Sequence, residues 1–318
     1  MTSAKSSLLL ADIGGTNARF AILEDGEFRC RAVVPVADYA EPLAALRAFL
    51  AGAARDHRPT KAVIAAAGPV SDGRIAMTNA AWVIDGKAIG RSLQLTSVQV
   101  VNDFAAVALS LPALTPNDIR VVGGGSPVID APRAVIGPGT GFGVGALIAG
   151  RGEEINLVSE GGHATLAAAN KHEDAVIQAM RDNFSHVSIE RVLSGDGLVQ
   201  LYRAVKLVDG IVAPDRDAPG IVAHAQAKDC AASAATLELF CAFLGSVAGD
   251  LALIFGARGG VYIGGGIVRR FADFLAQSSF RERFETKGRL RPYLSEIPSF
   301  IILNPEPAFL GLARLGRE

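Results

Sequence analysis

The sequence predicts an α/β fold of two lobes, and three observations support that prediction. Short apolar runs alternate with segments of helical periodicity along most of the chain, a pattern typical of α/β proteins. The length of 318 residues suggests about two domains, because a domain typically has ~150 residues. A strand-turn-strand pattern occurs once around Gly15-Thr16 and again around Gly139-Thr140, as a weak internal repeat that indicates two similar lobes.

The N-terminal part of the chain is expected to alternate strands with helices. Leucines at helical spacing behind Pro42 identify its first helix, and Pro112 ends the second. A tight turn at Gly14-Gly15 joins the first two strands. The expected elements are strands at 8–12, 17–23, 61–66 and 98–101 and helices over 39–55 and 104–111.

The remainder of the chain is expected to be richer in helices. A strand-turn-strand unit over 134–149 precedes them. The further expected elements are helices over 173–183, 196–207, 232–256, 267–276 and from 307, and strands at 260–263 and 299–303. Prolines and glycines between 112 and 133 favour a domain boundary there. We expect a small α/β domain over residues 1–112 plus 304–318 and a larger α/β domain over 113–303.

The composition excludes several classes of protein. Lys plus Arg number 31 and Asp plus Glu 32, so the net charge of −1 lacks the basic excess of a nucleic-acid binder. The three cysteines, Cys30, Cys230 and Cys241, make neither a disulfide framework nor the spacing of a zinc site. The apolar run 8–11 is too short for a secretory signal, and no stretch suits a membrane span. We therefore expect a cytoplasmic protein without zinc, nucleic acid or membrane partner.

Glycine is used unusually often, and its 35 residues include clusters at 14–15, 137–145 and 264–266 that follow or join apolar runs. Glycine turns expose backbone N–H groups and let a phosphate approach closely. One such cluster is typical of an ordinary hairpin turn, whereas three favour a phosphate cradle. A P-loop is excluded because alanine follows the one Gly-Lys pair, Gly86-Lys87. A dinucleotide fingerprint fails because a strand, and not a helix, follows the second cluster.

These clusters resemble, in order, the nucleotide-binding motifs of the sugar kinase, actin and chaperone ATPase superfamily. The first phosphate loop is matched by Asp12-Ile-Gly-Gly-Thr-Asn-Ala-Arg19, the second by Gly137-Pro-Gly-Thr-Gly141 and the adenosine segment by Gly264-Gly-Gly266-Ile-Val. Four further motifs are similar to those of the bacterial ATP-dependent glucokinases: Ala76-Met-Thr-Asn79 with Trp82, Asn102-Asp-Phe104, Glu160-Gly-Gly-His163 and Glu190-Arg-Val-Leu-Ser-Gly195. The motifs occur in family order from residue 12 to about 268, so the resemblance covers nearly the whole chain.

The resemblance implies a ribonuclease-H-like, actin-like ATPase fold with a cleft between two domains. It also implies transfer of the γ-phosphoryl group of ATP to the 6-hydroxyl of glucose, a reaction of glycolysis, with Mg²⁺ as cofactor and a homodimeric assembly. The zinc motif of the related repressor branch is missing, because no cysteine lies between Cys30 and Cys230. Two alternatives stay open: a kinase for another hexose or an amino sugar, and a non-catalytic sugar sensor on the same fold.

Asp103 is the candidate catalytic residue. It follows the strand at 98–101, and ligands of open α/β sheets gather at the carboxyl ends of strands. A carboxylate there can take the proton of an attacking hydroxyl. The bare sequence favours an N-cap for the helix over 104–111 instead. With Asn102 beside it, the resemblance makes Asp103 the expected catalytic base.

Sugar hydroxyls need partners that donate and accept hydrogen bonds, as amides, carboxylates and imidazoles do. Gly161-Gly162 lets the flanking polar side chains converge, although an exposed turn is the ordinary interpretation. Outside the resemblance, Glu190 would be a first-turn helix carboxylate. The resemblance implies that glucose is bound by Asn79, Asn102, Glu160, His163 and Glu190.

The resemblance assigns the glycine clusters to ATP. Asp12 is expected to hold Mg²⁺ through water, the alternative being a cap of the hairpin, and Arg19 is expected to be a solvated or paired charge. The implied ATP-binding residues are Ala11, Asp12, Ile13, Gly14, Gly15, Thr16, Gly137, Gly139, Thr140, Gly141, Gly264, Gly265 and Gly266.

Overall fold

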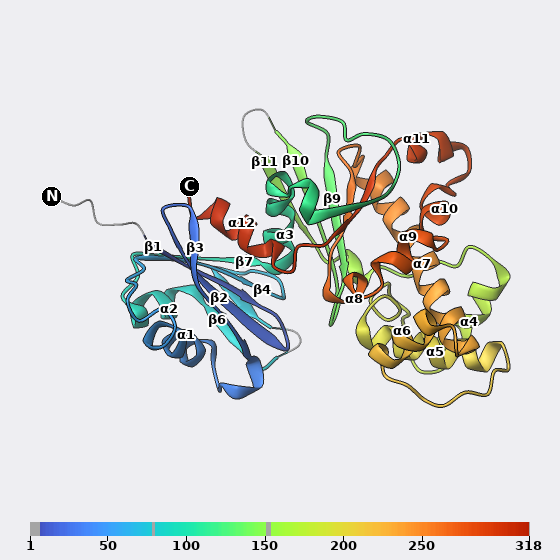
Figure 1. Cartoon of the computed structure of the whole chain (residues 1–318), viewed down its shortest axis with the longest axis horizontal. Coiled ribbons are helices and arrows are strands. Elements are labelled where there is room, and N and C mark those ends of the chain that lie inside the picture. The colour runs from blue at the N-terminus through green and yellow to red at the C-terminus, as the bar shows by residue number, and fades with distance from the viewer. Residues whose placement is uncertain (1–6, 78–79, 151–153, 318) are drawn as a thin grey trace. The chain divides into compact units, whose positions relative to one another are not determined.

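The computed structural model describes residues 7–77, 80–150 and 154–317 and divides the chain into two compact units (Figure 1). Unit 1 comprises Met1–Leu114 and Glu306–Glu318, and unit 2 comprises Thr115–Pro305. Each unit has its own central sheet and its own hydrophobic core, so the α/β class predicted from the sequence is confirmed.

A five-stranded sheet with the order β3-β2-β1-β4-β7 forms the centre of unit 1. Its strands are β1 (Ser7–Ile13), β2 (Asn17–Glu24), β3 (Glu27–Pro35), β4 (Lys61–Ala66) and β7 (Ser97–Asn102). The first three strands form an antiparallel meander, and β4 and β7 continue parallel to β1. Ile13, Ala66 and Asn102 lie in register, so the carboxyl ends of the three parallel strands form one edge of the sheet.

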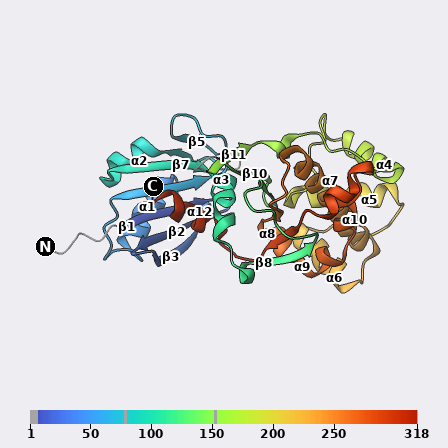
Figure 2. The same ribbon diagram turned by 90° about the horizontal axis from the view of Figure 1, so that it is seen from above.

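Helices cover both faces of this sheet, because successive residues of β1 are apolar and point to opposite sides. Leu9 and Ile13 pack in one cluster with Leu46 of α1 and Ile89 of α2, and Leu10 packs in the other with residues of α3 and α12. In Figures 1 and 2 the red helix α12 lies beside α3 and over the strands of the sheet. The remaining elements of unit 1 are α1 (Pro42–Ala51), β5 (Arg74–Ala76), β6 (Val83–Asp85), α2 (Gly86–Leu93), α3 (Asp103–Ser110) and α12 (Pro307–Leu315).

The helices α3 and α12 approach each other through small residues. A Cβ atom added to Gly311 of α12 would lie 1.9 Å from the carbonyl oxygen of Ala106 in α3. Because the two main chains are in contact at this point, any side chain at position 311 would push the helices apart. The C-terminal helix thus fixes the position of α3 against the sheet.

The sheet of unit 2 repeats the same topology and adds one strand. Its order is β11-β10-β9-β12-β13-β8, with an antiparallel meander of three strands next to two parallel strands. This is the internal repeat that the Gly-Thr pairs predict. The strands are β8 (Ile119–Gly123), β9 (Arg133–Pro138), β10 (Phe142–Ala149), β11 (Glu154–Ser159), β12 (Val261–Ile263) and β13 (Ser299–Ile302).

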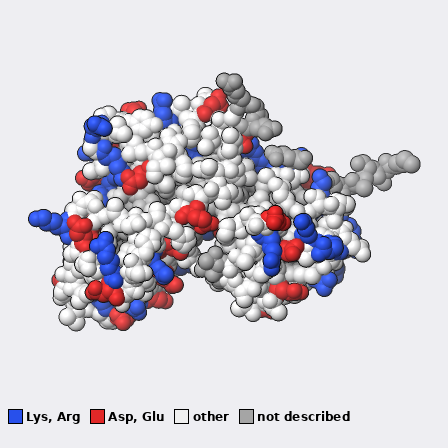
Figure 3. Space-filling view, turned by 180° about the vertical axis from the view of Figure 1, so that it is seen from behind, with Lys and Arg blue, Asp and Glu red and all other residues white. Residues whose placement is uncertain are grey.

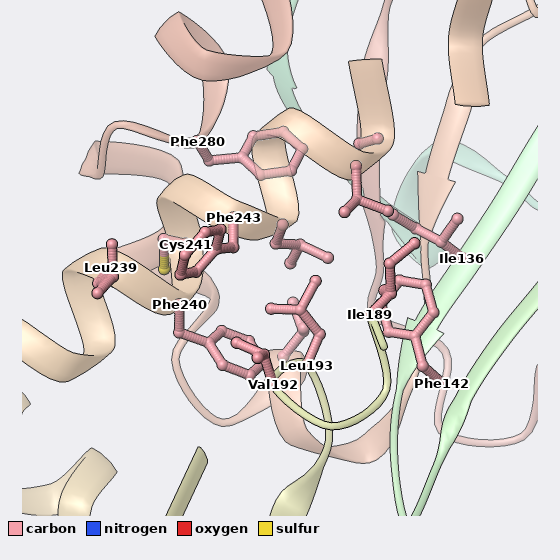
Figure 4. Packing of buried hydrophobic residues seen from close by; sticks show 14 of the residues in the cluster. Ile136, Phe142, Ile189, Val192, Leu193, Leu239, Phe240, Cys241, Phe243 and Phe280 are labelled. Carbon is pink, nitrogen blue, oxygen red and sulfur yellow. The ribbon is translucent and has the colours of Figure 1, made fainter. Parts of the chain in front are cut away.

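The 25-residue helix α7 (Ala231–Phe255) runs through the core of unit 2. Figure 4 shows Phe240 and Phe243 of this helix in one cluster with Phe280 of α10 and Leu193. Helix α7 is long and apolar enough to span a membrane, but it is mostly buried inside the fold, as is the core helix of a globular domain. The other helices of unit 2 are α4 (Lys171–Arg181), α5 (Gly195–Val208), α6 (Ala218–Ala227), α8 (Gly266–Arg269), α9 (Ala272–Gln277), α10 (Phe280–Glu285) and α11 (Arg291–Ser295).

The predicted elements are present within a few residues of their expected bounds, with one exception. The single helix expected over 267–276 is two helices, because the backbone leaves the helical conformation at Phe271 (φ −133°), whose ring is fully buried. Elements that the sequence did not indicate include the edge strands β3, β8 and β11 and the helices α2, α6, α10 and α11. Short 3₁₀ turns occupy Val36–Asp38, Leu111–Ala113, Pro116–Asp118, Gly161–His163 and Gly288–Leu290.

Charges of both signs lie close together on the surface. On the face shown in Figure 3, Lys and Arg side chains are interspersed with Asp and Glu over each unit. Elsewhere oppositely charged side chains form ion pairs, such as Lys206–Asp215 (2.8 Å). This face therefore has no basic stripe of the kind that follows a nucleic-acid backbone.

A buried ion pair joins three helices of unit 2. Glu173 of α4 is 1% exposed, and both of its carboxylate oxygens accept hydrogen bonds from the guanidinium of Arg283 in α10. Arg283 also donates to the hydroxyl of Ser246 in α7 at 2.8 Å. Burial alone would raise the pKa of Glu173, but the hydrogen bonds from Arg283 and from the backbone N–H of Ala169 outweigh it and hold the pKa below its usual value.

We predict that Glu173→Gln lowers the free energy of unfolding by about 3–5 kcal/mol, because it leaves the Arg283 charge buried without its partner. Asp174→Asn is the matched control, since it removes a carboxylate from an exposed position in the same helix turn and is expected to cost only about 0.3–1 kcal/mol. Urea denaturation of both variants measures the difference. Equal losses would show that the Glu173–Arg283 pair does not stabilise unit 2.

The same ion pair predicts a direction for the dependence of stability on pH. A carboxyl group with a lowered folded-state pKa stabilises the protein above its unfolded-state pKa, about 4.3 for Glu, and loses that effect as the pH falls through the folded-state value. The difference in stability between wild type and Glu173→Gln is therefore expected to shrink on acidification below about pH 4. A constant difference down to pH 2 would contradict the assignment.

Candidate active site

The first glycine loop of unit 1 connects β1 to β2. The N–H of Gly14 donates to the carbonyl oxygen of Asn17 at 3.0 Å and closes the hairpin, while Thr16 is exposed at its tip. Ala11 and Ile13 are fully buried in β1, so only their backbones can take part in binding a ligand. The loop is thus a tight turn in which Thr16 is exposed and Gly14 and Gly15 are partly buried.

Asp12 carries the one acidic side chain of this loop, and it lies opposite Arg19 in the β1–β2 register. Its Oδ2 is 3.4 Å from Nη1 of Arg19, so Arg19 is a paired charge. Burial raises the pKa of Asp12, an effect that Arg19 opposes and the Glu306 carboxylate reinforces. Burial disfavours the charged form of a carboxylate, and a nearby cation stabilises that form. Among the residues that the structure describes, no group of three His, Cys, Asp or Glu side chains could hold a metal ion.

Asn102 caps helix α3, which corrects the alternative that Asp103 is the cap. The Oδ1 of Asn102 accepts hydrogen bonds from the N–H groups of Phe104 at 2.9 Å and Ala105 at 3.1 Å, and its Nδ2 donates to the carbonyl oxygen of Gly68 at 3.1 Å. The fold therefore uses much of the hydrogen-bonding capacity of this buried amide, which reduces what Asn102 can offer a sugar. Asp103 is the first residue of the helix, half-buried, with Oδ1 2.9 Å from the N–H of Phe104.

The sheet brings Asp103 and Asp12 to one edge of unit 1. Asp12 precedes the end of β1 by one residue, and Asp103 directly follows β7. Ala66 of β4 lies between these two strands, in register with both Ile13 and Asn102. The two carboxylates thus lie at the carboxyl ends of parallel strands, where α/β proteins bind their ligands.

In unit 2, the second and third glycine clusters lie side by side. Strands β9 and β12 are parallel with Ile136 opposite Ile263, so residues 264–266 leave β12 beside Gly137 and Pro138, the last residues of β9. The N–H of Gly264 donates to the carbonyl oxygen of Ile136 at 2.7 Å. Gly265 has a φ of +92°, and a Cβ there would lie 2.1 Å from the carbonyl oxygen of Pro138. The two clusters are therefore in direct main-chain contact.

The candidate sugar-binding residues of unit 2 converge around a 3₁₀ turn at Gly161–His163. His163 Nε2 is 3.9 Å from Oε2 of Glu160, and both side chains are more than half exposed. The N–H of Glu190 donates to the carbonyl oxygen of Gly162 at 2.9 Å. A side chain at Gly162 is impossible in this arrangement, because its Cβ would lie 2.2 Å from the carbonyl oxygen of Phe142.

Glu190 lies in a turn before α5, which corrects the alternative of a first-turn helix carboxylate. Its Oε2 accepts a hydrogen bond from the N–H of Phe142 at 2.8 Å. The motif that begins at Glu190 ends at Gly195, whose N–H donates to the carbonyl oxygen of Gly139 at 2.9 Å. The three candidate sugar ligands of unit 2 and the candidate phosphate loop at 137–141 are therefore parts of one hydrogen-bonded main-chain frame.

The predicted residues that remain are accounted for as follows. Asn79 lies outside the described residues, and Thr140 is exposed at the tip of the β9–β10 turn. The backbone N–H of Phe142 and the carbonyl oxygen of Gly68 orient site residues, but sequence reasoning missed them. Backbone groups carry no residue-type signal, so only the fold could identify them.

Known proteins are similar to this chain over nearly its whole length. The model of the glucokinase family matches residues 9–318. The chain is 46% identical over 310 residues to a glucokinase of Paramagnetospirillum magneticum, covering 97% of both proteins. It is 45% identical over 311 residues to a glucokinase of Nitrobacter hamburgensis, covering 98% of this chain and 97% of that protein.

Solved structures give the same result for the fold. The crystal structure of a glucokinase from an Antarctic psychrotroph superposes with a TM-score of 0.87 at 37% identity, covering 98% of this chain and 99% of that one. The actin-like ATPase fold expected from the motifs is thereby confirmed. The family match spans nearly the whole chain and includes every glycine cluster and candidate side chain considered above, so the chain belongs to the glucokinase family.

Proposed function

We propose that this enzyme transfers the γ-phosphoryl group of ATP to the 6-hydroxyl of glucose, with Asp103 as the general base. The observation that carries the proposal is the main-chain frame of unit 2, in which Glu190 is bonded to Phe142 and Gly162, and Gly195 to Gly139. Kinase catalysis rests mainly on positioning and on electrostatic stabilisation. A sugar-binding set that shares its backbone hydrogen bonds with a glycine loop suits a reaction between a hydroxyl and a phosphoryl group.

In the proposed step, the Asp103 carboxylate accepts the proton of the 6-hydroxyl as that oxygen attacks the γ-phosphorus. The bond between the γ-phosphorus and the bridging oxygen breaks, and ADP leaves. Because Asn102 caps α3, Asp103 is not required for that purpose. Its location at the carboxyl end of β7 supports the role of a base that meets the substrate.

Glu160, His163 and Glu190 are the proposed ligands of the sugar in unit 2, together with Asn102 and Asn79 from unit 1. Carboxylate oxygens accept hydrogen bonds from vicinal hydroxyls, and the His163 imidazole can donate or accept one. The bond from the Phe142 N–H supports this role for Glu190, because it fixes one carboxylate oxygen and orients the other. A set of this kind distinguishes hexoses by the positions of their hydroxyls.

ATP is proposed to bind along the three glycine clusters. The β1–β2 and β9–β10 turns would face its phosphates, and residues 264–266 its nucleoside. Asp12 would hold hydrated Mg²⁺, which neutralises charge on the phosphates. The raised pKa of Asp12 supports this assignment, since a cation relieves the cost of burying its charge.

We also propose a homodimer in the cytoplasm. The three cysteines of the chain are all free, which suits a reducing compartment. A kinase for another hexose or an amino sugar remains the alternative within the same reaction class. The alternative outside this reaction class is a non-catalytic sugar sensor. Turnover in the experiments below distinguishes a kinase from a sensor. Sedimentation equilibrium tests the dimer directly.

Asp103→Asn is predicted to lower kcat by ~10²–10⁴, because asparagine is nearly isosteric but cannot take a proton. Glucose binding and thermal stability are expected to stay near the wild-type values, since the Asn102 cap is intact. Asp174→Asn is the matched control, as it makes the same change in the first turn of α4. The measurements are kcat and the glucose dissociation constant side by side.

A kcat for Asp103→Asn within about threefold of wild type, well short of the ~1.4 kcal/mol that one decade represents, would contradict the catalytic assignment. Absence of turnover in the wild type, with glucose still bound, would favour the sensor. Both outcomes are read from the same pair of assays.

Gly139→Val is predicted to weaken ATP binding at least about tenfold while the glucose dissociation constant changes by less than about twofold. The nearest atom to an added Cβ is the carbonyl oxygen of Gly141, at an ordinary 3.9 Å, so we expect the loss to come from a clash with the phosphate and not from the fold. Gly265→Ala is the contrasting variant, because its Cβ meets Pro138 and it should lower the melting temperature. Unchanged ATP affinity in folded Gly139→Val would remove the second loop from the proposal.

Glucose is predicted to have the highest kcat/KM among common hexoses. An analogue that lacks a matching hydroxyl leaves polar groups of the binding site without partners. Its kcat/KM can be lower by ~10⁴ or more in favourable cases. A coupled assay of ADP release over glucose, mannose, galactose, fructose and N-acetylated hexosamines measures the order. If fructose or an N-acetylated sugar were turned over faster than glucose, that sugar and not glucose would be the assigned substrate.

A further inference from the structure

A second constellation of reactive side chains lies in unit 1, on the edge strand β3 and its surroundings. The Sγ of Cys30 is 3.1 Å from Nε2 of His57, and Nδ1 of the same ring is 3.0 Å from Oε1 of Glu24. A thiol, an imidazole and a carboxylate in this order have the arrangement of a nucleophile, its base and the group that orients the base. We refer to these three residues as the Cys30 cluster.

A β-bulge brings Cys30 to this position. The pairing of β2 with β3 shifts register between Phe20 and Ile22, and Cys30 has a left-handed φ of +46°. Before the bulge, Phe28 packs with the α3–α12 cluster, whereas Cys30 packs with the opposite cluster that includes α1. In a regular strand these residues, two positions apart, would share a face. The bulge therefore turns the thiol towards the segment after α1, where His57 lies.

The hydrogen bonds fix the roles of the two ring nitrogens of His57. An ionised carboxylate only accepts hydrogen bonds, so Glu24 selects the tautomer with the proton on Nδ1. Nε2 then carries a lone pair that faces the Cys30 thiol. The side chains of His57 and Glu24 are 19% and 17% exposed, so the cluster is shielded from bulk water but not closed to it.

The Cys30 cluster is separate from the proposed active site within unit 1. Glu24 pairs with Ser7 at the start of β1, and Asp12 lies five residues further along that strand. At a rise of ~3.3 Å per residue, the two positions are roughly 17 Å apart along the sheet. Phosphoryl transfer therefore provides no reason for this arrangement.

We propose that Cys30 is a nucleophilic thiol that forms a mixed disulfide with a small-molecule disulfide such as oxidised glutathione, with His57 as the proton acceptor. Nε2 takes the thiol proton, and the thiolate attacks one sulfur of the disulfide. The new Sγ–S bond forms as the S–S bond of the reagent breaks. The leaving thiolate carries the electron pair away and recovers a proton from the imidazolium. The reaction needs no other oxidant, because the reagent disulfide is reduced to one thiol.

The other two cysteines decide the design of the test. Burial raises the pKa of Cys241, which lies fully inside the core of unit 2, so this thiol does not compete. Hydrogen bonding by Ser233 at the start of α7 lowers the pKa of Cys230 to about 7, so that thiol can react as well. The experiment therefore uses Cys230→Ser as its parent protein.

The parent is incubated with oxidised glutathione at pH 7.5, and the adduct is followed by intact mass and located by peptide mapping. We expect one adduct, on Cys30, that dithiothreitol removes. His57→Gln in this parent is expected to slow adduct formation at least about tenfold, because glutamine cannot take up a proton. Glu24→Gln, which keeps the imidazole, is expected to give an intermediate rate. Cys30→Ser should give no adduct.

Glucose phosphorylation and the melting temperature verify that each variant is folded. If His57→Gln does not fold, the comparison between the parent and Glu24→Gln decides the matter alone. An adduct rate on Cys30 that is equal in the parent and in every folded variant of His57 or Glu24 would overturn the proposal. An adduct confined to another residue, or none at all, would overturn it as well.

Discussion

Contact between main chains at positions without a side chain is the constraint on which this structure depends. In unit 1, Gly311 lets α12 touch α3 at the carbonyl oxygen of Ala106. In unit 2, Gly162 and Gly265 each leave room for a carbonyl oxygen about two ångströms from where a Cβ would be, at 2.2 and 2.1 Å. A methyl group at any of these three positions would overlap the carbonyl oxygen, so the backbone would have to move to accommodate it. The glycines thus set where the loops of the site can lie.

This constraint also explains how unit 2 combines two tasks. The turn that carries Glu160 and His163 lies against β10 at Phe142, and the same residue donates its N–H to Glu190. Strand β10 begins directly after the phosphate loop, so a displacement of the loop would move all three side chains. Under the proposed function, binding of a sugar and binding of a phosphate would in this way be linked within one unit, without any helix or domain having to transmit the change.

Much of the fold could be predicted from the sequence because its signals are local. Apolar runs that end at Asp12 and Asn102, and leucines at helical spacing behind Pro42, identify strands and helices without further information. The edge strand β3 was missed because its exposed residues alternate with only partly buried ones, so it has no strongly apolar side. Helix α6 was missed because Pro219 and Gly220 disfavour helices in general, although proline is well accommodated in a first turn, here capped by Asp217.

In the candidate site, too, features set by neighbouring residues could be predicted, whereas contacts between residues far apart in the sequence could not. Motifs could name Asp103, Glu160 and Glu190, because residue type and spacing carry the resemblance. They could not show that Asn102 is the helix cap, since Asn and Asp are both good caps and stand next to each other. Nor could they show that Glu190 is held by the backbone of Phe142, since that contact joins residues 48 positions apart and involves no side chain of the partner.

The bulge at Cys30 has a consequence for the solubility of the chain. Strand β3 ends the sheet of unit 1, and a straight outer strand of nine residues would offer its unpaired N–H and C=O groups to a strand of another molecule. The left-handed backbone at Cys30 interrupts that row at its middle, and the exposed Arg29 places a positive charge beside the break, while Arg31 is paired with Glu306. Two identical edges would therefore meet with mismatched hydrogen bonds and with like charges opposed. The irregularity that positions a thiol also discourages the first step of aggregation.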